Sequence, residues 1–325
     1  MTYAPSSSIS SSEFRFKVND LPYEMCCKLY ILDEKNYAPT LSNVPKTALE
    51  VSTYKDVTCF GTLPCYDPDG DETYIEIVSY PEKGLLILED KEVGSYRYIP
   101  YDGSTGKDSF TYVAVDSVGN VSEEATVKVT ISKPNTKVTY ADMDGHPAYC
   151  SALRLAEEGV LIGEQMDGAY YFQPELPVSR EQFVAMAMSA AGLDSLSGVG
   201  ITGFSDDQAI PTWAKGYVSS ALRSGILTGM KDPEGSICFN SGAAVTKAEA
   251  TVILDRILNV SDVPDLAVLA EASIPTWASQ SAANMSAVSV LSGFDSMDEG
   301  INRAQAADML CAMLDVLQAR EQGWA

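Results

Sequence analysis

Ile210-Pro211-Thr212-Trp213-Ala214 is the stretch that decides the fold of the second half of this chain, because it returns unchanged as Ile274-Pro275-Thr276-Trp277-Ala278. The two copies are 64 residues apart, and one further step of 64 towards the N-terminus places Tyr149 at the position of Trp213. A period of this size is typical of tandem arrays, in which each unit buries its apolar face against its neighbours.

Two more signatures follow each copy in the same order. The first is a glycine-bounded turn at residues 159–163, 225–229 and 289–293, and the second is a helix start at residues 178–182, 245–249 and 301–305. Three signatures repeated three times predict three repeats, which we assign to residues 134–198, 199–262 and 263–325.

Apolar residues in these repeats recur with the helical period of 3.6. In the last segment, for example, Ala306, Met309, Leu310, Met313 and Leu317 form one stripe. The pattern predicts helices at about 147–158, 179–191, 212–224, 246–259, 276–289 and 302–319. We therefore expect an all-α module with three repeats.

Residues 38–133 have a different pattern, in which short runs carry an apolar residue at every second position. Turn residues separate the runs, and this alternation indicates an antiparallel β-sandwich. Sliding residues 1–37 forward by about 96 positions places Phe14 under Phe110 and Ile31 under Val127. We read residues 1–37 as a truncated copy of this sandwich, and we expect the missing upstream part of the polypeptide to carry a signal peptide.

The composition narrows the functional classes. The chain has 325 residues, 46% hydrophobic and 21% charged, with a net charge of −23. Nucleic-acid binding is disfavoured because phosphate contacts need clustered cations, and no apolar run is long enough to span a membrane. A single histidine, His146, leaves little room for a catalytic triad or a histidine-based metal site. Seven cysteines are scattered, and a Cys59–Cys65 disulfide stays open.

Each helix start has the pattern of a capping box. Ser179, Thr246 and Asn302 precede the helices, and Gln182, Glu249 and Gln305 follow three residues later. Between them, Arg180, Lys247 and Arg303 put a cation at the first helical position, where the helix macrodipole disfavours it. Two explanations stay open for these cations: an anionic partner, or salt bridges to nearby acids.

Two further groups of residues each have two interpretations. Trp213 and Trp277 are first of all core residues, but a Trp in a groove can also stack on a sugar ring. Asp67, Asp69 and Asp71 have the spacing of a calcium loop, with hard oxygen ligands, and the same residues are common in a solvated turn.

The motifs Asp67-Pro68-Asp69-Gly70-Asp71, Tyr96-x-Tyr98-x-Pro100 and Gly106-x-Asp108-Ser109-Phe110 make residues 38–133 similar to the cadherin-like/Ig-like repeats of large bacterial surface proteins. That resemblance implies a stalk or spacer domain. Some members of the family bind calcium between aspartates, so the resemblance adds to the case for Asp67, Asp69 and Asp71 as ligands.

The helical repeats resemble S-layer homology domains. The middle copy carries the family pattern with Phe204-Ser205-Asp206, Trp213, residues 225–229 and Val245-Thr246-Lys247-Ala248-Glu249. The resemblance implies three repeats assembled as a pseudo-threefold, with grooves that hold a pyruvylated secondary cell-wall polysaccharide. The groove contacts carried over from the family are Arg180, Lys247 and Arg303, supported by Trp213, Trp277, Asp142 and Asp206. Tyr149 replaces Trp in the first copy, so we expect one or two working grooves.

These inferences predict a non-catalytic cell-surface anchor that displays upstream domains and needs no cofactor. Its partner would be secondary cell-wall polysaccharide or peptidoglycan, and the chain would be a monomer in isolation or part of an S-layer lattice. We expect an extracellular location in the cell wall or S-layer of a Gram-positive bacterium. Two alternatives stay open: the anchor of a larger surface enzyme such as a polysaccharide hydrolase, and a peptidoglycan-binding or lattice-forming unit.

Overall fold

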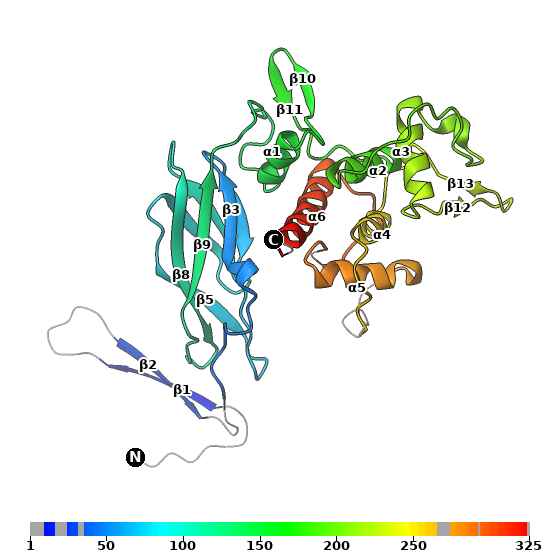
Figure 1. Cartoon of the computed structure of the whole chain (residues 1–325). Coiled ribbons are helices and arrows are strands. Elements are labelled where there is room, and N and C mark those ends of the chain that lie inside the picture. The colour runs from blue at the N-terminus through cyan, green and yellow to red at the C-terminus, as the bar shows by residue number, and fades with distance from the viewer. Residues whose placement is uncertain (1–9, 17–24, 32–35, 265–273, 292, 324–325) are drawn as a thin grey trace. The chain divides into compact units, whose positions relative to one another are not determined.

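The computed structural model describes residues 10–16, 25–31, 36–264, 274–291 and 293–323 (Figure 1). It divides into two compact units, Met1–Lys133 and Pro134–Ala325. Within residues 1–37, strands β1 (Ser10–Phe16) and β2 (Met25–Ile31) form an antiparallel hairpin, and most of the other residues of this segment lie outside the described ranges. The truncated copy stays a prediction.

The first unit contains two sheets that supply the predicted sandwich. The four-stranded sheet has the order β3 (Glu50–Tyr54), β9 (Ala125–Ser132), β8 (Gly106–Asp116), β5 (Thr73–Ser79), and the three-stranded sheet has the order β4 (Cys59–Thr62), β7 (Ser95–Pro100), β6 (Gly84–Asp90). The predicted antiparallel arrangement is wrong for one pair, because β3 runs parallel to β9. Side-chain alternation is the same beside a parallel or an antiparallel neighbour, so the sequence pattern did not distinguish them.

Aromatic side chains fill the centre of the sandwich. Tyr98, Phe110 and Tyr112 are fully buried, and along β9 every second residue points into the core. The Tyr98 hydroxyl donates a 2.7 Å hydrogen bond to Asp108 Oδ2, and the backbone N–H groups of Glu82 and Lys83 donate to the same carboxylate at 2.9 and 2.8 Å. Burial alone would raise the pKa of Asp108, but these hydrogen bonds hold it below the ordinary value.

Asp108→Ala is therefore expected to destabilise the sandwich, because these three donors and the backbone N–H of Ser109 all lose this acceptor. We expect a loss of about 2 kcal/mol in the free energy of unfolding, measured by urea denaturation at neutral pH. Since the pKa is lowered on folding, the contribution is complete above the ordinary carboxylate pKa and disappears as the pH falls through the folded value. The control is Asp102→Ala, which removes an exposed carboxylate from the preceding turn. Equal stability of the two variants would contradict the role of Asp108.

The second unit contains the six predicted helices with bounds close to those expected. They are α1 (Tyr149–Glu157), α2 (Arg180–Ala190), α3 (Thr212–Arg223), α4 (Lys247–Leu258), α5 (Ser279–Ala287) and α6 (Arg303–Gly323), with short 3-10 turns η2 (Asp207–Ala209) and η4 (Thr276–Ala278). The all-α description needs correction, because two small hairpins accompany the helices. They are β10 (Glu164–Met166) with β11 (Ala169–Tyr171), and β12 (Met230–Lys231) with β13 (Ile237–Cys238). Strands of two or three residues are too short to produce a readable alternation.

The starts of α2, α4 and α6 are joined by a closed cycle of backbone hydrogen bonds. Val178 N donates to Ile301 O at 3.0 Å, Ile301 N donates to Val245 O at 2.9 Å, and Val245 N donates back to Val178 O at 3.0 Å. A second cycle lies two residues further on, where Arg180 N donates to Ala243 O, Lys247 N to Glu299 O and Arg303 N to Leu176 O, each at 2.9 Å. Each helix start is thus held by the other two.

The three predicted capping boxes are confirmed. Ser179 and Gln182 bond each other's backbone N–H groups at 3.4 and 3.0 Å, and Thr246 and Glu249 do the same at 3.2 and 3.1 Å. Asn302 and Gln305 form the third pair, with both distances at 2.9 Å. These bonds satisfy amides that the first turn of each helix leaves without a partner.

The turns after α1, α3 and α5 share a left-handed residue. Gly159 and Gly225 have φ of 68° and 75°, and Ser289 has φ of 60° at the corresponding position. After each one, a 6→1 backbone bond closes the helix, from Val160 to Leu155 (2.9 Å), Ile226 to Ala221 (2.9 Å) and Val290 to Met285 (2.8 Å). Ser289 therefore adopts a conformation that a side chain disfavours.

Ser289→Gly is expected to raise the free energy of unfolding of the helical unit by about 1 kcal/mol, because glycine has no Cβ to strain this turn. The reciprocal variant Gly225→Ser is expected to lower it by a similar amount, since a Cβ at Gly225 meets no atom within 4 Å and only the backbone conformation changes. Thermal unfolding of both variants measures the difference. A Ser289→Gly variant with unchanged stability would show that the turn is unstrained.

Candidate functional site

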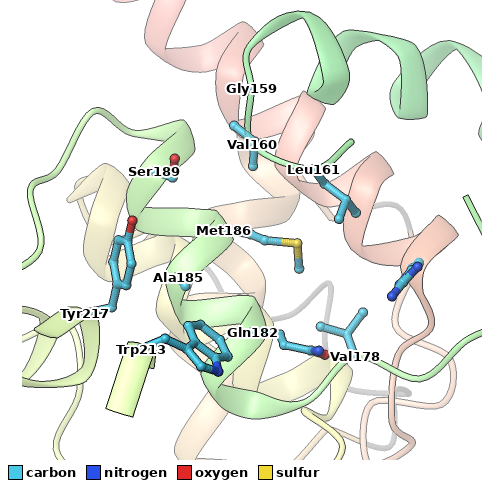
Figure 2. Close-up of a pocket in the computed structure, with 11 residues that line it drawn as sticks. Gly159, Val160, Leu161, Val178, Gln182, Ala185, Met186, Ser189, Trp213 and Tyr217 are labelled. Carbon is cyan, nitrogen blue, oxygen red and sulfur yellow. The ribbon is translucent and has the colours of Figure 1, made fainter. Parts of the chain in front are cut away.

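A groove of about 340 Å³ opens beside α2. One wall is the turn formed by Gly159, Val160 and Leu161, and the other carries Trp213 and Tyr217 from α3 (Figure 2). Helix α2 contributes Gln182, Ala185, Met186 and Ser189, while Arg303 reaches the groove from the start of α6. We call this the first groove.

A second groove of about 420 Å³ opens beside α4. Several of its lining residues occupy the positions that line the first groove when the sequence repeats are aligned. Its wall is the turn at residues 226–229, its tryptophan is Trp277, and its cation from a neighbouring helix start is Arg180. Helix α4 contributes Glu249, Val252, Ile253 and Arg256, and β12 adds Met230 and Lys231. Both grooves therefore combine an indole, a glycine-bounded turn and a guanidinium.

The three cations at the helix starts do not share one environment. Arg303 donates to Phe172 O at 3.0 Å and lies 3.5 Å from the exposed Glu164 carboxylate. Arg180 lies 2.9 Å from Glu249 Oε1, and its guanidinium covers the ring of Phe239. Lys247 Nζ donates to Asp295 O at 3.2 Å. A direct ligand contact by all three would require each to be accessible, but Arg180 is only 7% exposed, between Glu249 of α4 and the ring of Phe239.

Both tryptophans are exposed, so the interpretation of them as core residues is wrong. Trp213 is 54% exposed and Trp277 is 60% exposed. The buried stripe of α3 consists of Ala214, Val218 and Ala221, which are four and three residues apart and share one face. Trp213 lies one position before this stripe and points into the first groove instead.

Asp142 and Asp206 do not line either groove. Asp142 accepts from the backbone of Phe172 and Gln173 at 2.9 and 2.7 Å, and Asp206 accepts from Phe239 and Asn240, both at 2.7 Å. Gln173 and Asn240 have positive φ. The two carboxylates therefore hold equivalent strained loops, which is a structural role.

Several residues that line the grooves were not singled out by the sequence patterns, namely Gln182, Glu249, Tyr217, Lys231 and Arg256. Gln182 and Glu249 are predicted only as helix caps. The aligned repeats do show that this position is an acid in one copy and an amide in another. Lys231 and Arg256 fall outside the repeated signatures, so repetition did not mark them.

The aspartates considered for calcium form a hydrogen-bonded turn. Asp67 Oδ1 accepts from the backbone of Asp69 and Asp71 at 2.9 and 3.1 Å, Asp69 accepts from Tyr37 N at 2.6 Å, and Asp71 accepts from the side chain of Asn36. Within the described ranges, no group of three His, Cys, Asp or Glu residues is arranged to hold a metal ion. Calcium stays a hypothesis. Cys59 and Cys65 form no disulfide with each other.

Residues 36–131 match the bacterial Ig domain family (Big_9), and residues 203–251 match the S-layer homology domain family. The chain thus contains a bacterial Ig domain followed by an S-layer homology domain, as the sequence motifs predicted. An S-layer homology domain implies anchoring at the cell surface. The match covers one of the three predicted repeats, so the number of repeats stays a prediction.

Two relatives share this region at low identity. The chain is 28% identical over 127 residues to "Exoglucanase XynX" of Acetivibrio thermocellus, which is 38% of this chain and 11% of the relative. It is 29% identical over 126 residues to "Amylopullulanase" of Thermoanaerobacterium thermosulfurigenes, again 38% of this chain and 6% of the relative. The chain therefore matches a small part of the length of either protein.

Among solved structures, an endo-fucoidan hydrolase of glycoside hydrolase family 107 aligns with 42% of this chain at 17% identity and a TM-score of 0.23, covering 21% of that chain. The fibronectin(III)-like modules of Clostridium thermocellum CbhA align with 41% of this chain at 14% identity and a TM-score of 0.23, covering 68% of that chain. Neither value supports a conclusion about function. Of the helices that the structure describes, none has the length and apolarity needed to cross a bilayer.

One charged network positions the helix that carries Trp213. Asp207, in η2, accepts from Lys215 Nζ at 2.6 Å, from Thr202 N at 2.7 Å and from Thr202 Oγ1 at 2.8 Å. These hydrogen bonds, that from Lys215 above all, lower the pKa of Asp207 to about 2.

Asp207→Asn is expected to lose a pH-dependent part of the stability of the helical unit. Because the pKa of Asp207 is lowered on folding, its contribution is complete above the ordinary pKa of 3.8 and is lost as the pH falls towards 2. The urea midpoints of wild type and variant should differ by a constant amount above about pH 5 and approach each other as the pH falls through 2, where half of the folded molecules have protonated Asp207. A difference that stays constant down to pH 2 would contradict this assignment.

Proposed function

We propose that the chain is a non-catalytic cell-surface anchor whose helical unit consists of three S-layer homology repeats with approximate threefold symmetry. The closed cycle through Val178, Ile301 and Val245 supports this arrangement, because each of the three helix starts donates to one neighbour and accepts from the other. Three capping boxes in the same positions support the same count. The proposed repeats span residues 134–198, 199–262 and 263–325, after the Ig domain at 38–133.

The observation that carries the ligand proposal is the pairing of an exposed indole with a cation in both grooves. Trp213 faces the first groove with Arg303, and Trp277 faces the second groove, whose lining contains three cationic side chains. An indole can stack on the apolar C–H face of a sugar, and a cation can form charge-assisted hydrogen bonds with a carboxylate. The proposed ligand is a secondary cell-wall polysaccharide that carries acidic groups, such as pyruvate ketals.

The proposed location is the cell wall or S-layer of a Gram-positive bacterium. The proposed chain is a monomer in isolation or a part of an S-layer lattice, and the same anchor serves in both. One observation favours a larger enzyme as the parent protein: the relatives are named an exoglucanase and an amylopullulanase, and this chain spans 11% and 6% of them. In that second candidate function, the anchor retains a polysaccharide hydrolase at the surface.

The test is a pull-down of the full chain on purified Gram-positive cell walls, before and after acid extraction of the secondary polymer. We expect wild type to bind only the walls that retain the polymer. Binding that survives extraction would point to peptidoglycan instead, and no binding to either preparation would contradict the anchor.

Trp213→Ala is expected to weaken binding roughly fivefold, because an aromatic stacking contact contributes about 1 kcal/mol. The matched control is Tyr80→Ala, which removes an aromatic side chain that is 67% exposed in the Ig unit. Both affinities are measured by the same sedimentation assay with the polymer-bearing walls. Equal losses for the two variants would remove the first groove from the ligand site.

A further inference from the structure

The two grooves differ at one aligned position that faces the cation. The third residue of α2 is Gln182, which is neutral, whereas the third residue of α4 is Glu249. Glu249 Oε1 lies 2.9 Å from Arg180 Nη1, and its Oε2 accepts from Thr246 N at 3.1 Å. The side chains of Arg180 and Glu249 are only 9% and 16% exposed. The charge of Arg180 is therefore neutralised inside the second groove by an acid that the helix start holds in place.

An anion that approached Arg180 would meet this carboxylate. It would have to displace Glu249 from a largely buried ion pair, or lie beside it with the same sign of charge, and both are unfavourable. The carboxylate paired with Arg303 is the exposed Glu164, at the longer distance of 3.5 Å, and it does not line the first groove, where Arg303 is the single charged residue.

The second groove contains two other cations besides the neutralised Arg180. Lys231, on β12, and Arg256, on α4, both line it and are exposed, and one guanidinium nitrogen of Arg256 donates to Ile226 O at 3.1 Å. In the part of the chain that the structure describes, neither forms an ion pair with a carboxylate. With Arg180 and Glu249 cancelling, Lys231 and Arg256 leave an excess of two positive charges, in a chain whose net charge is −23.

Arg256 occupies a position that is polar and uncharged in the first groove. It lies seven residues after Glu249, as Ser189 lies seven residues after Gln182, and both Arg256 and Ser189 line their groove. Seven residues are two helical turns, so each pair lies on one face of its helix. The first groove therefore has an amide and a hydroxyl at the two positions where the second groove has a carboxylate and a guanidinium.

We infer that the second groove binds the acidic group of its ligand through Lys231 and Arg256, whereas Arg180 is a positioning residue held by Glu249. Trp277 supplies the stacking surface beside them. In the first groove, Arg303 makes the corresponding contact itself. The inference rests on the proposed binding of an acidic wall polysaccharide, and it assigns different contact residues to two grooves of similar shape.

The experiment uses the full chain with Trp213→Ala, so that binding reports mainly on the second groove. Two double variants are added to this background: Lys231→Gln with Arg256→Gln, and Arg180→Gln with Glu249→Gln. Binding to polymer-bearing walls is expected to fall about tenfold or more for the first double variant and only about twofold for the second. A control with Lys137→Gln and Arg223→Gln removes two exposed cations outside both grooves and should leave binding unchanged.

The opposite order of the two double variants would overturn the inference, because it would make Arg180 the contact. So would a loss of all binding with Trp213→Ala alone, or no effect of Lys231→Gln with Arg256→Gln. If the variant without the Arg180–Glu249 pair does not fold, Arg256→Ser, which copies the residue of the first groove, tests the same assignment and should weaken binding about fivefold. The wild-type chain is measured alongside the variants. Its failure to bind these walls would contradict the proposed function rather than the assignment of contacts in the second groove.

Discussion

The closed cycle of backbone hydrogen bonds among Val178, Ile301 and Val245 fixes the rest of the helical unit. It brings three helix starts together, so the side chain at the first position of each helix projects towards a neighbour. This explains cations at a position that the macrodipole disfavours. Each finds a partner outside its own helix: Arg303 donates to Phe172 O, Lys247 donates to Asp295 O, and Arg180 forms an ion pair with Glu249. Of the two explanations left open by the sequence, the salt bridge is present at Arg180 and Arg303, and the anionic partner stays a proposal.

Local signals were sufficient to predict the helices of the second unit, but not its two short hairpins. The capping boxes, the left-handed turns and the helical stripes depend on residues within one or two turns of each other, and the sequence shows them directly. The parallel pairing of β3 with β9 and the burial of Arg180 depend on partners more than 50 residues away along the chain. The exposure of Trp213 depends on which face of α3 packs against α2. A sequence repeat indicates that each unit packs against other units, but it does not indicate which side chains this packing buries.

Asp108 connects strands of the Ig domain, just as the hydrogen-bonded cycle connects the helix starts of the helical unit. It joins the buried Tyr98 to the backbone before β6, so one carboxylate connects β7 and β8 to the start of another strand. The sequence marked Asp108 as part of a family motif without indicating its partners. Each unit has its own core and its own polar connection, and no residue of the sandwich lines either groove.

The two grooves share their backbone conformation more closely than they share their charged side chains. The cycle and the capping box need only an acceptor at the third helical position, and both Gln182 and Glu249 supply one. An amide therefore replaces an acid there without altering the helix start, although the exchange changes the charge beside the guanidinium. Two turns later the groove wall accepts Ser189 or Arg256 equally well, because both are at the solvent-facing side of their helix. A repeated fold can thus provide grooves of one shape whose ligand preferences differ.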